Sequence, residues 1–441
     1  MNKKKEAKIT PPALLRGMKD ILPSDQDYWF WLGDKVRAMA AAYGFERIDT
    51  PIMEGTSLFS RSIGEETDIV SKEMYSFVDQ GGDKITLRPE GTAPIARAYI
   101  EHGMINQPQP IKLYYWGPFF RHERPQAGRY RQLWQLGFEV LGEADPVIDA
   151  EIILLVHSFY QEIGLPVTIQ VNSIGCPVCR EDYKLVLVDF FRPRRSSLCE
   201  DCKKRLVKNP LRILDCKVKE CAEIAKEVPQ IVDHLCEDCR LHFTQVLEFL
   251  DDLEISYSLN PHLVRGLDYY TKTIFEVWTA DGEVGSQSAL AGGGRYNNLV
   301  ESLGGRPTPA IGFAAGIERM IIKLKEKNIA APAADRREIF VAQLGDKARK
   351  KCLKLFEELR RDGFKVRENL SKNGLKDQLE VANKLGVKFA LIIGQKEIMD
   401  DTVLIRDMES GIQEVLDYKR IAQEVRKRLE KSNTNFINHT P

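Results

Sequence analysis

Arginine is concentrated in residues 120–131, which read FRHERPQAGRYR. Planar guanidinium groups pair well with phosphate oxygens. In the run that follows, Gln135 and Glu139 lie on the polar side of a period-two pattern whose other side is apolar. An amide and a carboxylate beside clustered arginines predict a ligand with a polar organic part and a phosphorylated part. The alternative is a hairpin whose polar face is simply solvated.

A second polar group is Glu90-Gly91-Thr92, between a predicted strand and a predicted helix. Such a corner can direct a carboxylate and a hydroxyl toward an ammonium group. The alternative is an ordinary helix start, with Thr92 as the N-cap and Glu90 in solvent. The glycines at 292–294 would let backbone approach a ligand closely, or would form a plain turn.

Eight of the nine cysteines fall between residues 176 and 239. Three pairs have CxxC spacing and one is looser: Cys176/Cys179, Cys199/Cys202, Cys236/Cys239 and Cys216/Cys221. Eight thiols in four pairs fit two four-cysteine structural zinc sites. A reduced, metal-binding role is favoured over a disulfide framework. The alternative is a helical segment with incidental buried thiols.

The composition limits the class of protein. A chain of 441 residues with 43% hydrophobic content is globular and predicts two or three domains. The formal net charge is zero, from 64 basic and 64 acidic residues, so a nucleic-acid contact would need local patches. The basic start lacks an apolar core, and no apolar run reaches the roughly 18 residues of a membrane helix. We therefore expect a cytoplasmic protein without membrane contact.

The hydrophobic pattern predicts the elements that position these groups. An amphipathic helix with a capping-box-like start at Ser24 ends at Gly44, and a strand at 45–50 follows. The segment 57–73 is predicted to be a mobile loop, and a hairpin is predicted over 112–142. Further expected elements are strands at 85–88, 167–171 and 273–278 and helices at 93–102, 144–163 and 317–325.

From Arg336 a βαβαβ alternation predicts a separate α/β domain that ends in a helix at 418–431. We expect a linker at 330–335 and a disordered tail at 432–441.

Several stretches, in order, resemble the class II aminoacyl-tRNA synthetases, and specifically the bacterial type of the histidyl-tRNA synthetase family. The matching stretches are Gly44–Pro51 (motif 1), Phe120–Glu139 (motif 2), Gly312–Arg319 (motif 3), Thr86-Leu87-Arg88-Pro89-Glu90-Gly91-Thr92 and Leu263-Val264-Arg265-Gly266-Leu267-Asp268-Tyr269-Tyr270.

The resemblance implies an α+β fold whose catalytic core is an antiparallel sheet flanked by helices. That core would occupy residues 1–175 and 254–329, interrupted by a helical, cysteine-bearing insert at 176–253. The domain at 336–431 would bind the anticodon. The implied activity is ATP-dependent activation of L-histidine to histidyl-adenylate, with Mg²⁺, and transfer to tRNA(His). Motif 1 implies a homodimer.

The resemblance also implies roles for single residues. Arg121 and Arg265 would be catalytic, holding the α-phosphate, and Glu123 and Arg319 would contact ATP. The histidine-binding set would be Glu90, Gly91, Thr92, Gln135, Glu139, Arg265, Tyr269 and Tyr270, with Glu139 and the two tyrosines around the imidazole. Gln126, Arg129 and Arg131 would meet the tRNA acceptor end.

Two other functions compete with this one. A catalytically silent paralogue that regulates histidine biosynthesis would lack the C-terminal domain and tends to lose the arginine and tyrosines of the 263–270 stretch, which this chain keeps. A zinc-ribbon RNA-binding protein without enzyme activity would leave Glu90, Glu139 and Arg265 unexplained.

Overall fold

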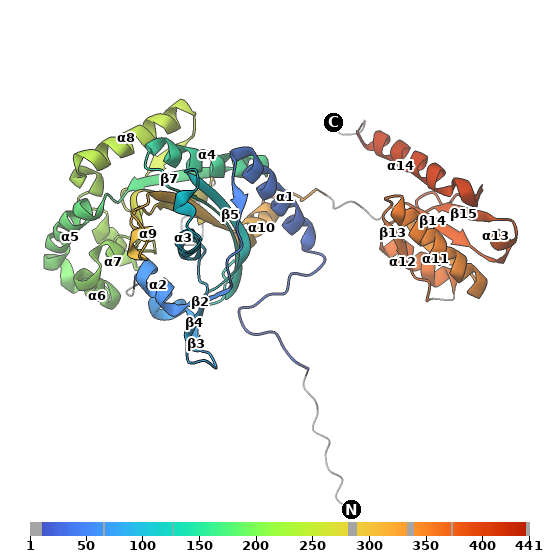
Figure 1. Cartoon of the computed structure of the whole chain (residues 1–441), viewed down its shortest axis with the longest axis horizontal. Helices are drawn as coiled ribbons and strands as arrows, with labels where there is room; N and C mark the ends of the chain where they lie inside the picture. The colour runs from blue at the N-terminus through green and yellow to red at the C-terminus, as the bar shows by residue number, and fades with distance from the viewer. Residues whose placement is uncertain are drawn as a thin grey trace, which may run out of the picture. The chain divides into compact units, whose positions relative to one another are not determined.

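A computed structural model describes residues 11–64, 67–126, 128–280, 289–332, 339–371 and 374–437, with the side chains after residue 430 left out. The chain forms two compact units, Met1–Ala331 and Pro332–Pro441 (Figure 1). Half of the predicted 330–335 linker, residues 333–335, lies outside the described residues. Among the described helices, none is both long and apolar enough to cross a membrane.

The first unit is built on a sheet of eight strands in the order β1-β5-β6-β11-β10-β9-β7-β8. All neighbouring pairs are antiparallel except β1 with β5 and β7 with β8. This arrangement confirms the predicted α+β class with an antiparallel-rich core. The strands are β1 (Glu46–Arg47), β5 (Ile111–Phe120), β6 (Gln132–Leu141), β7 (Val167–Ser173), β8 (Tyr257–Leu259), β9 (Thr271–Thr279), β10 (Ala289–Arg295) and β11 (Ala310–Gly316).

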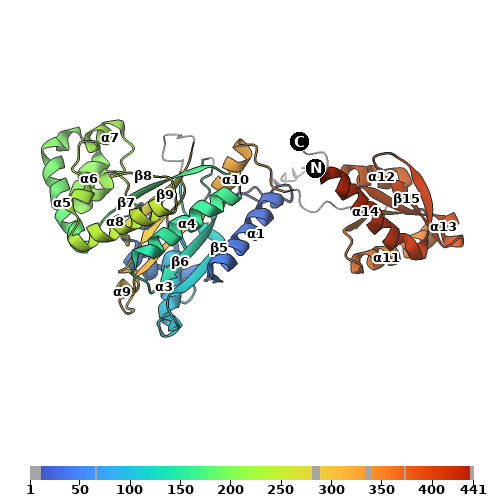
Figure 2. The same ribbon diagram turned by 90° about the horizontal axis from the view of Figure 1, so that it is seen from above.

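Helices cover one face of this sheet, where α1, α4 and α8 run side by side (Figure 2). The alternation on β6 explains this layer, because Leu136, Phe138 and Val140 point into the core that these helices share. Gln135 and Glu139 therefore face the opposite side. The helices are α1 (Gln26–Tyr43), α4 (Pro146–Glu162), α8 (Glu237–Asp252) and α10 (Ile317–Glu326).

Smaller elements surround the other side of the sheet: β2 (Met53–Gly55), β3 (Tyr75–Val78) and β4 (Lys84–Leu87), with α2 (Thr56–Ile63), a π-helix (Ile69–Glu73), α3 (Thr92–Glu101) and α9 (Leu299–Ser302). The prediction of a mobile loop at 57–73 is wrong for most of its length. Its sparse apolar residues, Leu58, Phe59, Ile63 and Ile69, are buried in a small cluster of their own, and this packing stabilises helices that the polar composition does not favour.

Two element ends also differ from the prediction. The first helix starts after Asp25, and no side chain caps it, so Ser24 forms no capping box. The strand at 45–50 shrinks to β1, because only Glu46 and Arg47 pair with β5 before the chain leaves for Pro51.

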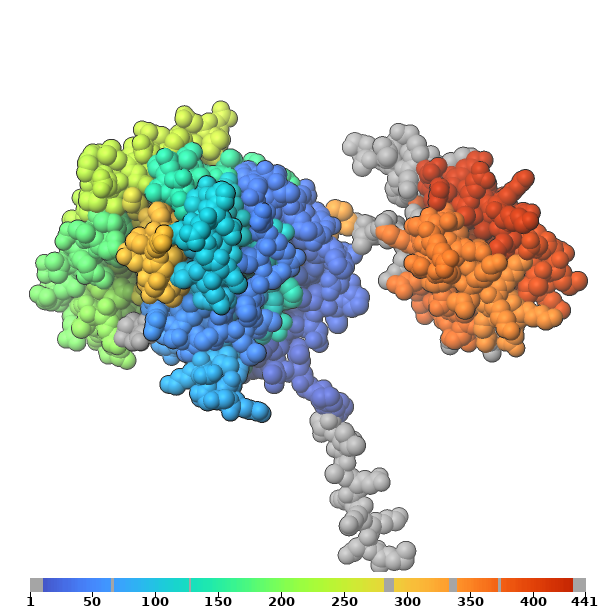
Figure 3. Space-filling model, viewed as in Figure 1, coloured from blue at the N-terminus to red at the C-terminus, as the bar shows by residue number. Residues whose placement is uncertain are grey.

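The insert leaves the sheet after β7 and returns through α8. It is helical, as predicted, and forms the green flank of the first unit beside the yellow-orange α9 region (Figure 3). Its helices before α8 are α5 (Pro177–Phe191), α6 (Glu200–Lys208) and α7 (Lys219–Ala225), joined by short 3-10 segments.

The second unit has its own core and a five-stranded sheet in the order β13-β12-β14-β15-β16. Here α14 runs six residues past the predicted end at Lys431, so the tail prediction is wrong up to Ile437, and residues 438–441 lie outside the described part. The elements are β12 (Ile339–Gln343), α11 (Asp346–Arg361), β13 (Val366–Glu368), α12 (Leu375–Lys384), β14 (Phe389–Ile393), α13 (Gln395–Met399), β15 (Thr402–Asp407), β16 (Gln413–Asp417) and α14 (Ile421–Ile437).

Candidate active site

Two adjoining cavities of about 250 and 310 Å³ lie on the face of the central sheet that carries Gln135. We call them the arginine cavity and the tyrosine cavity. The arginine cavity is lined by Arg121, Glu123, Arg129, Arg265, Glu276, Glu318 and Arg319, among others. The tyrosine cavity is lined by Glu90, Thr92, Tyr115, Tyr269, Tyr270 and Tyr296, among others. Both cavities share Arg121, Gln135 and Arg265, so these residues stand at their boundary.

Arg121 follows β5 and is fixed by backbone groups. Its N–H donates to the Arg131 carbonyl oxygen at 2.9 Å, and its Nε donates to the Pro89 carbonyl oxygen at 2.8 Å. The Nε bond fixes the guanidinium on a backbone oxygen, and no carboxylate of the described residues forms an ion pair with it. Its remaining N–H groups are therefore available to an anionic ligand.

Arg265 approaches from the 263–270 loop, which the structure brings to the same cavities from 144 positions further along the chain. Its Nη1 forms an ion pair with Glu276 on β9, and its buried Nε has no hydrogen-bond partner among the described residues. Burial opposes its charge, but the Glu276 carboxylate raises the pKa of Arg265, so the guanidinium stays protonated.

Arg319, in the first turn of α10, donates to the Ala289 and Gly128 carbonyl oxygens at 3.0 and 3.4 Å. Burial lowers the pKa of Arg319, and the positive charge of Arg129 lowers it further. An anion between these guanidinium groups would relieve their repulsion. The arginine cavity therefore suits a polyphosphate.

Carboxylates in the arginine cavity are already engaged. Glu123 pairs with Arg129 at 3.3 Å, and both oxygens of Glu318 accept the Trp134 backbone N–H at 3.0 Å. Burial raises the pKa of Glu318 to about 7. These groups shape and orient the cavity without neutralising all of its positive charge.

In the tyrosine cavity, Glu90 is buried and its carboxylate accepts the backbone N–H groups of Thr92 and Ala93 at 2.7 and 2.9 Å. Glu90, and not Thr92, thus satisfies the start of α3, which reverses the N-cap alternative. Burial raises the pKa of Glu90, and the two backbone bonds offset part of that rise. A cation in this cavity would complete the site.

Glu139 on β6 is 1% exposed, so the solvated-hairpin alternative is wrong at this position. Its two oxygens accept the Thr92 hydroxyl at 2.8 Å and the Tyr296 hydroxyl at 2.6 Å. Burial raises the pKa of Glu139 to about 8, even though both hydroxyl bonds lower it. An acid with this pKa can accept a hydrogen bond from, or exchange a proton with, a nitrogen base near neutral pH.

Three further polar side chains, Gln135, Tyr115 and Tyr269, line the tyrosine cavity. The buried Gln135 Oε1 and Tyr115 hydroxyl have no partner among the described residues. The Tyr269 hydroxyl lies 3.5 Å from Glu90 Oε2, and the Tyr269 and Tyr270 rings are in contact, with centroids 4.8 Å apart. Unpartnered acceptors beside two carboxylates predict a ligand rich in N–H donors.

Glycines keep both cavities open. A Cβ at Gly292 would overlap the Arg265 guanidinium, and one at Gly312 would overlap the Glu139 carboxylate. Gly292 and Gly293 lie inside β10, so the plain-turn alternative for 292–294 is wrong. Gly91 precedes α3 and packs under the Tyr115 ring, where a Cβ would come within 2.8 Å of the phenol oxygen.

Glu139 and Gly91 line neither cavity, although Glu139 is bonded to Thr92 and Tyr296 of the tyrosine cavity. The structure thus gathers the other residues predicted to bind ATP and histidine. It does not bring Gln126 and Arg131 into either cavity. Gln126 is exposed, and the Arg131 side chain packs under Gly17. The sequence analysis missed Tyr115, Tyr296 and Glu276. Tyr296 directly follows the glycines at 292–294, Tyr115 lies in the predicted 112–142 hairpin and Glu276 in the predicted 273–278 strand. No pattern in the sequence marked any of the three as a site residue.

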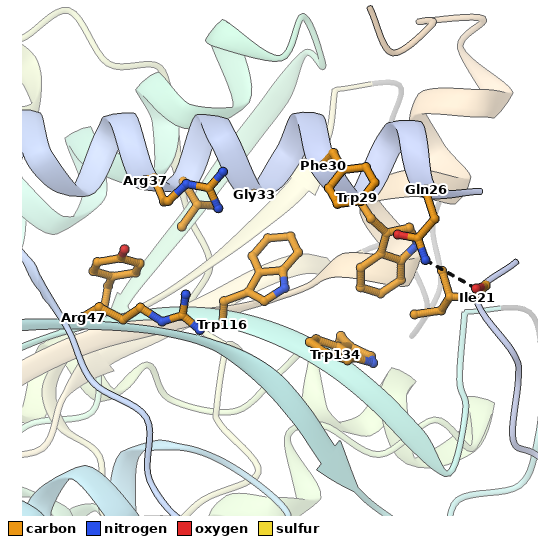
Figure 4. A pocket seen from close by; sticks show the side chains of 11 residues that line it. Ile21, Gln26, Trp29, Phe30, Gly33, Arg37, Arg47, Trp116 and Trp134 are labelled. Carbon is orange, nitrogen blue, oxygen red and sulfur yellow. Dashed lines mark hydrogen bonds between the residues drawn. The ribbon is translucent and has the colours of Figure 1, made fainter. Parts of the chain in front are cut away.

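A third hollow lies away from these cavities, between α1 and the β5–β6 hairpin. Trp29 points from α1 toward Trp116 and Trp134 on the strands (Figure 4), with ring centroids 6.1 and 5.5 Å away. Phe30, which also lines this hollow, is 64% exposed. Most of its lining residues are aromatic or aliphatic, together with Arg37 and Arg47.

Comparisons with known proteins identify the families that this chain matches. The family described as Histidyl-tRNA synthetase matches residues 17–176 and 206–320, and the family described as Anticodon binding domain matches residues 338–428. Histidine--tRNA ligase of Pelotomaculum thermopropionicum is 46% identical over 94% of this chain and 97% of the relative, and that of Natranaerobius thermophilus is 44% identical over 93% and 98%.

Solved structures match as well. The apo S. aureus histidyl-tRNA synthetase superposes with a TM-score of 0.79 at 37% identity, over 95% of this chain and 100% of that one. A Bacillus halodurans protein titled ATP phosphoribosyltransferase regulatory subunit/histidyl-tRNA synthetase shares the fold at 21% identity, with a TM-score of 0.63 over 88% and 99% of the two chains.

Proposed function

The chain belongs to the histidyl-tRNA synthetase family, and we propose that the arginine and tyrosine cavities together form its active site. It is a histidine–tRNA ligase of translation, which activates L-histidine with ATP, releases pyrophosphate, and transfers the histidyl group to the terminal ribose of tRNA(His). The observation that carries the site assignment is that Arg121 and Arg265 line both cavities at once. The α-phosphorus of ATP, to which the histidine carboxylate becomes bonded in the reaction, would lie at that boundary.

In the first step the histidine carboxylate attacks the α-phosphorus of ATP, and pyrophosphate leaves. Negative charge grows on the non-bridging oxygens, and fixed guanidinium groups stabilise it. Arg121 and Arg265 would hold these oxygens from two sides. Neither gives up its proton, so they act as charge clamps and not as bases.

The arginine cavity would hold the rest of ATP. We assign Arg319 to the γ-phosphate and Glu123 to the nucleotide, through its pairing with Arg129. The cavity carboxylates already have protein partners. Mg²⁺ would therefore enter bound to the ATP phosphates, where it would offset their charge.

The tyrosine cavity would hold histidine. The α-ammonium would lie among Glu90, Gln135 and the corner at Gly91 and Thr92. The imidazole would lie at Glu139, whose carboxyl the Tyr296 and Thr92 hydroxyls orient, with Tyr269 and Tyr270 around it. Analogues without ring nitrogens would leave these buried groups unpaired, a discrimination of roughly 10⁴–10⁵.

Histidine-dependent ATP–pyrophosphate exchange tests this proposal. The ligase should exchange pyrophosphate only when histidine is present. A catalytically silent paralogue or an RNA-binding protein would show no exchange with any amino acid. Absence of exchange would therefore reject the proposed active site.

Two contacts with tRNA follow from the proposal. The second unit, which matches the anticodon-binding family, would bind the anticodon. Gln126, Arg129 and Arg131 would meet the acceptor end, because the exposed loop that carries them lies beside the arginine cavity. Arg131 lines neither cavity, so Arg131→Gln should raise the KM for tRNA and leave amino-acid activation unchanged.

We also propose a homodimer in the cytoplasm that forms through the motif 1 region. The exposed Phe30 and the aromatic hollow under α1 support this interface, and nine free thiols suit a reducing compartment. Phe30→Glu should shift the protein to monomer in sedimentation, whereas Val207→Glu, at an even more exposed apolar position on α6, should not. A dimer with Phe30→Glu would place the interface elsewhere.

A further inference from the structure

The eight cysteines of the insert gather into two separate groups. Group A contains Cys176, Cys179, Cys236 and Cys239, and group B contains Cys199, Cys202, Cys216 and Cys221. Within each group all four sulfur atoms lie within 4.8 Å of one another, and all eight are free thiols. Four pairs can be divided into two sites in about three ways, and the fold selects one of them.

The sulfur spacing fits a four-coordinate metal. A zinc–sulfur bond of roughly 2.3 Å places the corners of a tetrahedron about 3.8 Å apart. Cys176 and Cys179 Sγ are 3.6 Å apart, and Cys199 and Cys216 Sγ are 3.9 Å apart. A disulfide needs about 2.0 Å. The spacing in both groups therefore matches ligands around one ion.

The backbone also favours thiolates at these positions. Each CxxC pair places its first cysteine at a helix N-cap and its second in the first turn, on α5, α6 and α8. The Cys236 N–H donates to Cys179 Sγ at 3.1 Å, and the Cys199 N–H donates to Cys221 Sγ at 3.2 Å. Such outer contacts orient metal ligands and stabilise their negative charge.

We propose that the insert binds two zinc ions, one through the four thiolates of group A and one through those of group B. Group A joins the point where the chain leaves β7 to the start of α8, so it closes the base of the insert. Group B ties α6 to α7 inside the insert. Both ions would be structural, because four protein ligands leave no open position for a substrate.

Zinc content of the full-length protein tests this proposal. Purified from zinc-supplemented cells, the chain should carry two zinc ions by mass spectrometry. Cys176→Ser/Cys179→Ser and Cys199→Ser/Cys202→Ser should each carry one. Cys352→Ser, which changes a buried cysteine of the second unit, should keep two. A wild-type chain with no zinc, or with one, overturns the assignment.

A second measurement does not depend on variants that could unfold. Titrating the wild-type thiols with a mercurial reagent in the presence of a zinc indicator should release two ions. Cobalt(II) exchanged into the protein should give the intense visible absorption of tetrahedral thiolate sites. Absence of zinc release and of the cobalt bands would also overturn the proposal.

Independently of the cysteines, the insert also contacts the backbone of Arg265 in the proposed active site. Arg212, between α6 and α7, donates from Nη1 to the backbone carbonyl oxygen of Arg265 at 3.1 Å. Its Nη2 lies 3.4 Å from Asp68 Oδ2. Nearby, Asn209 donates to Asp268 Oδ1 at 3.2 Å. The insert thus holds the backbone of the 263–270 loop, a contact that the sequence did not predict.

We infer that Arg212 is a positioning residue for Arg265, an inference that rests on the proposed function. Arg212→Ala should lower the kcat of exchange about tenfold, with the histidine KM and the unfolding midpoint near wild type. Arg212→Lys, which keeps a donor, should recover part of the rate. The matched control is Arg194→Ala, which removes a similar 2.8 Å bond to a carbonyl oxygen inside the insert and should leave the rate unchanged.

An unchanged kcat in Arg212→Ala, or a loss that merely tracks the folded fraction, would reject the positioning role. A wild-type protein without exchange would instead reject the proposed active site itself, so the two failures can be told apart.

Discussion

Replacing Glu139 by Gln tests the imidazole site most directly. The substitution keeps the shape of the side chain and can still accept one of the two hydroxyl bonds from Thr92 and Tyr296. It removes the ionisable acceptor for the imidazole N–H. When histidine binds, Glu139 can pass its proton to the imidazole, and a hydrogen bond between the resulting charged groups contributes about 1.5–3 kcal/mol, so the histidine KM should rise roughly 10- to 100-fold. The kcat should change much less, because Glu139 does not touch the phosphorus.

The same substitution should change how stability depends on pH. The pKa of Glu139 is about 8 when folded, against a model-peptide value of 4.5. A raised pKa gives stability that is complete below pH 4.5 and is lost as pH rises through 8. At about 1.4 kcal/mol for each pH unit, the full loss is roughly 5 kcal/mol. Gln does not titrate, so the variant should lack this component.

Tryptophan fluorescence is a suitable assay, because all five tryptophans lie in the first unit. Urea unfolding of the ligand-free protein at pH 6 and pH 8.5 should show a larger loss of stability in the wild type than in Glu139→Gln. Parallel pH dependence in the two proteins would refute the burial argument. An unchanged histidine KM would refute the imidazole assignment, whatever the stability data show.

Three other substitutions test the remaining parts of the site. Arg265→Ala should lower exchange on the order of 10²–10³-fold, while the matched surface change Arg240→Ala should not; a near-normal rate removes the assigned role. Tyr296→Phe removes a donor that lowers the pKa of Glu139, so the histidine KM should rise several-fold and the loss of stability should move to higher pH; no change in either quantity contradicts the hydroxyl contact. Gly292→Ala should displace the Arg265 guanidinium and lower kcat without lowering the unfolding midpoint, because the atoms nearest to the new methyl group are those at the guanidinium end of that side chain.

Much of the fold was predictable because its signals are local. The period-two pattern of 132–141 predicted β6 and its apolar face, and Gly44, which has a left-handed backbone at the helix end, predicted the C-terminus of α1. The βαβαβ order predicted most of the second unit. The 57–73 segment failed because a few apolar residues in a small cluster decided its conformation, and composition averages over them.

For the site, the sequence predicted which residues belong to it but not how they contact one another. By itself the sequence determined the family motifs, and these motifs named the side chains that we propose to contact ATP and histidine. Tertiary structure decided which oxygen of Glu139 meets Tyr296, 157 positions away, which carbonyl oxygen Arg212 holds, and how eight thiols divide into two groups. The physical reason is that burial and long-range contacts, which set pKa values and ligand geometry, depend on residues that only the folded chain brings together.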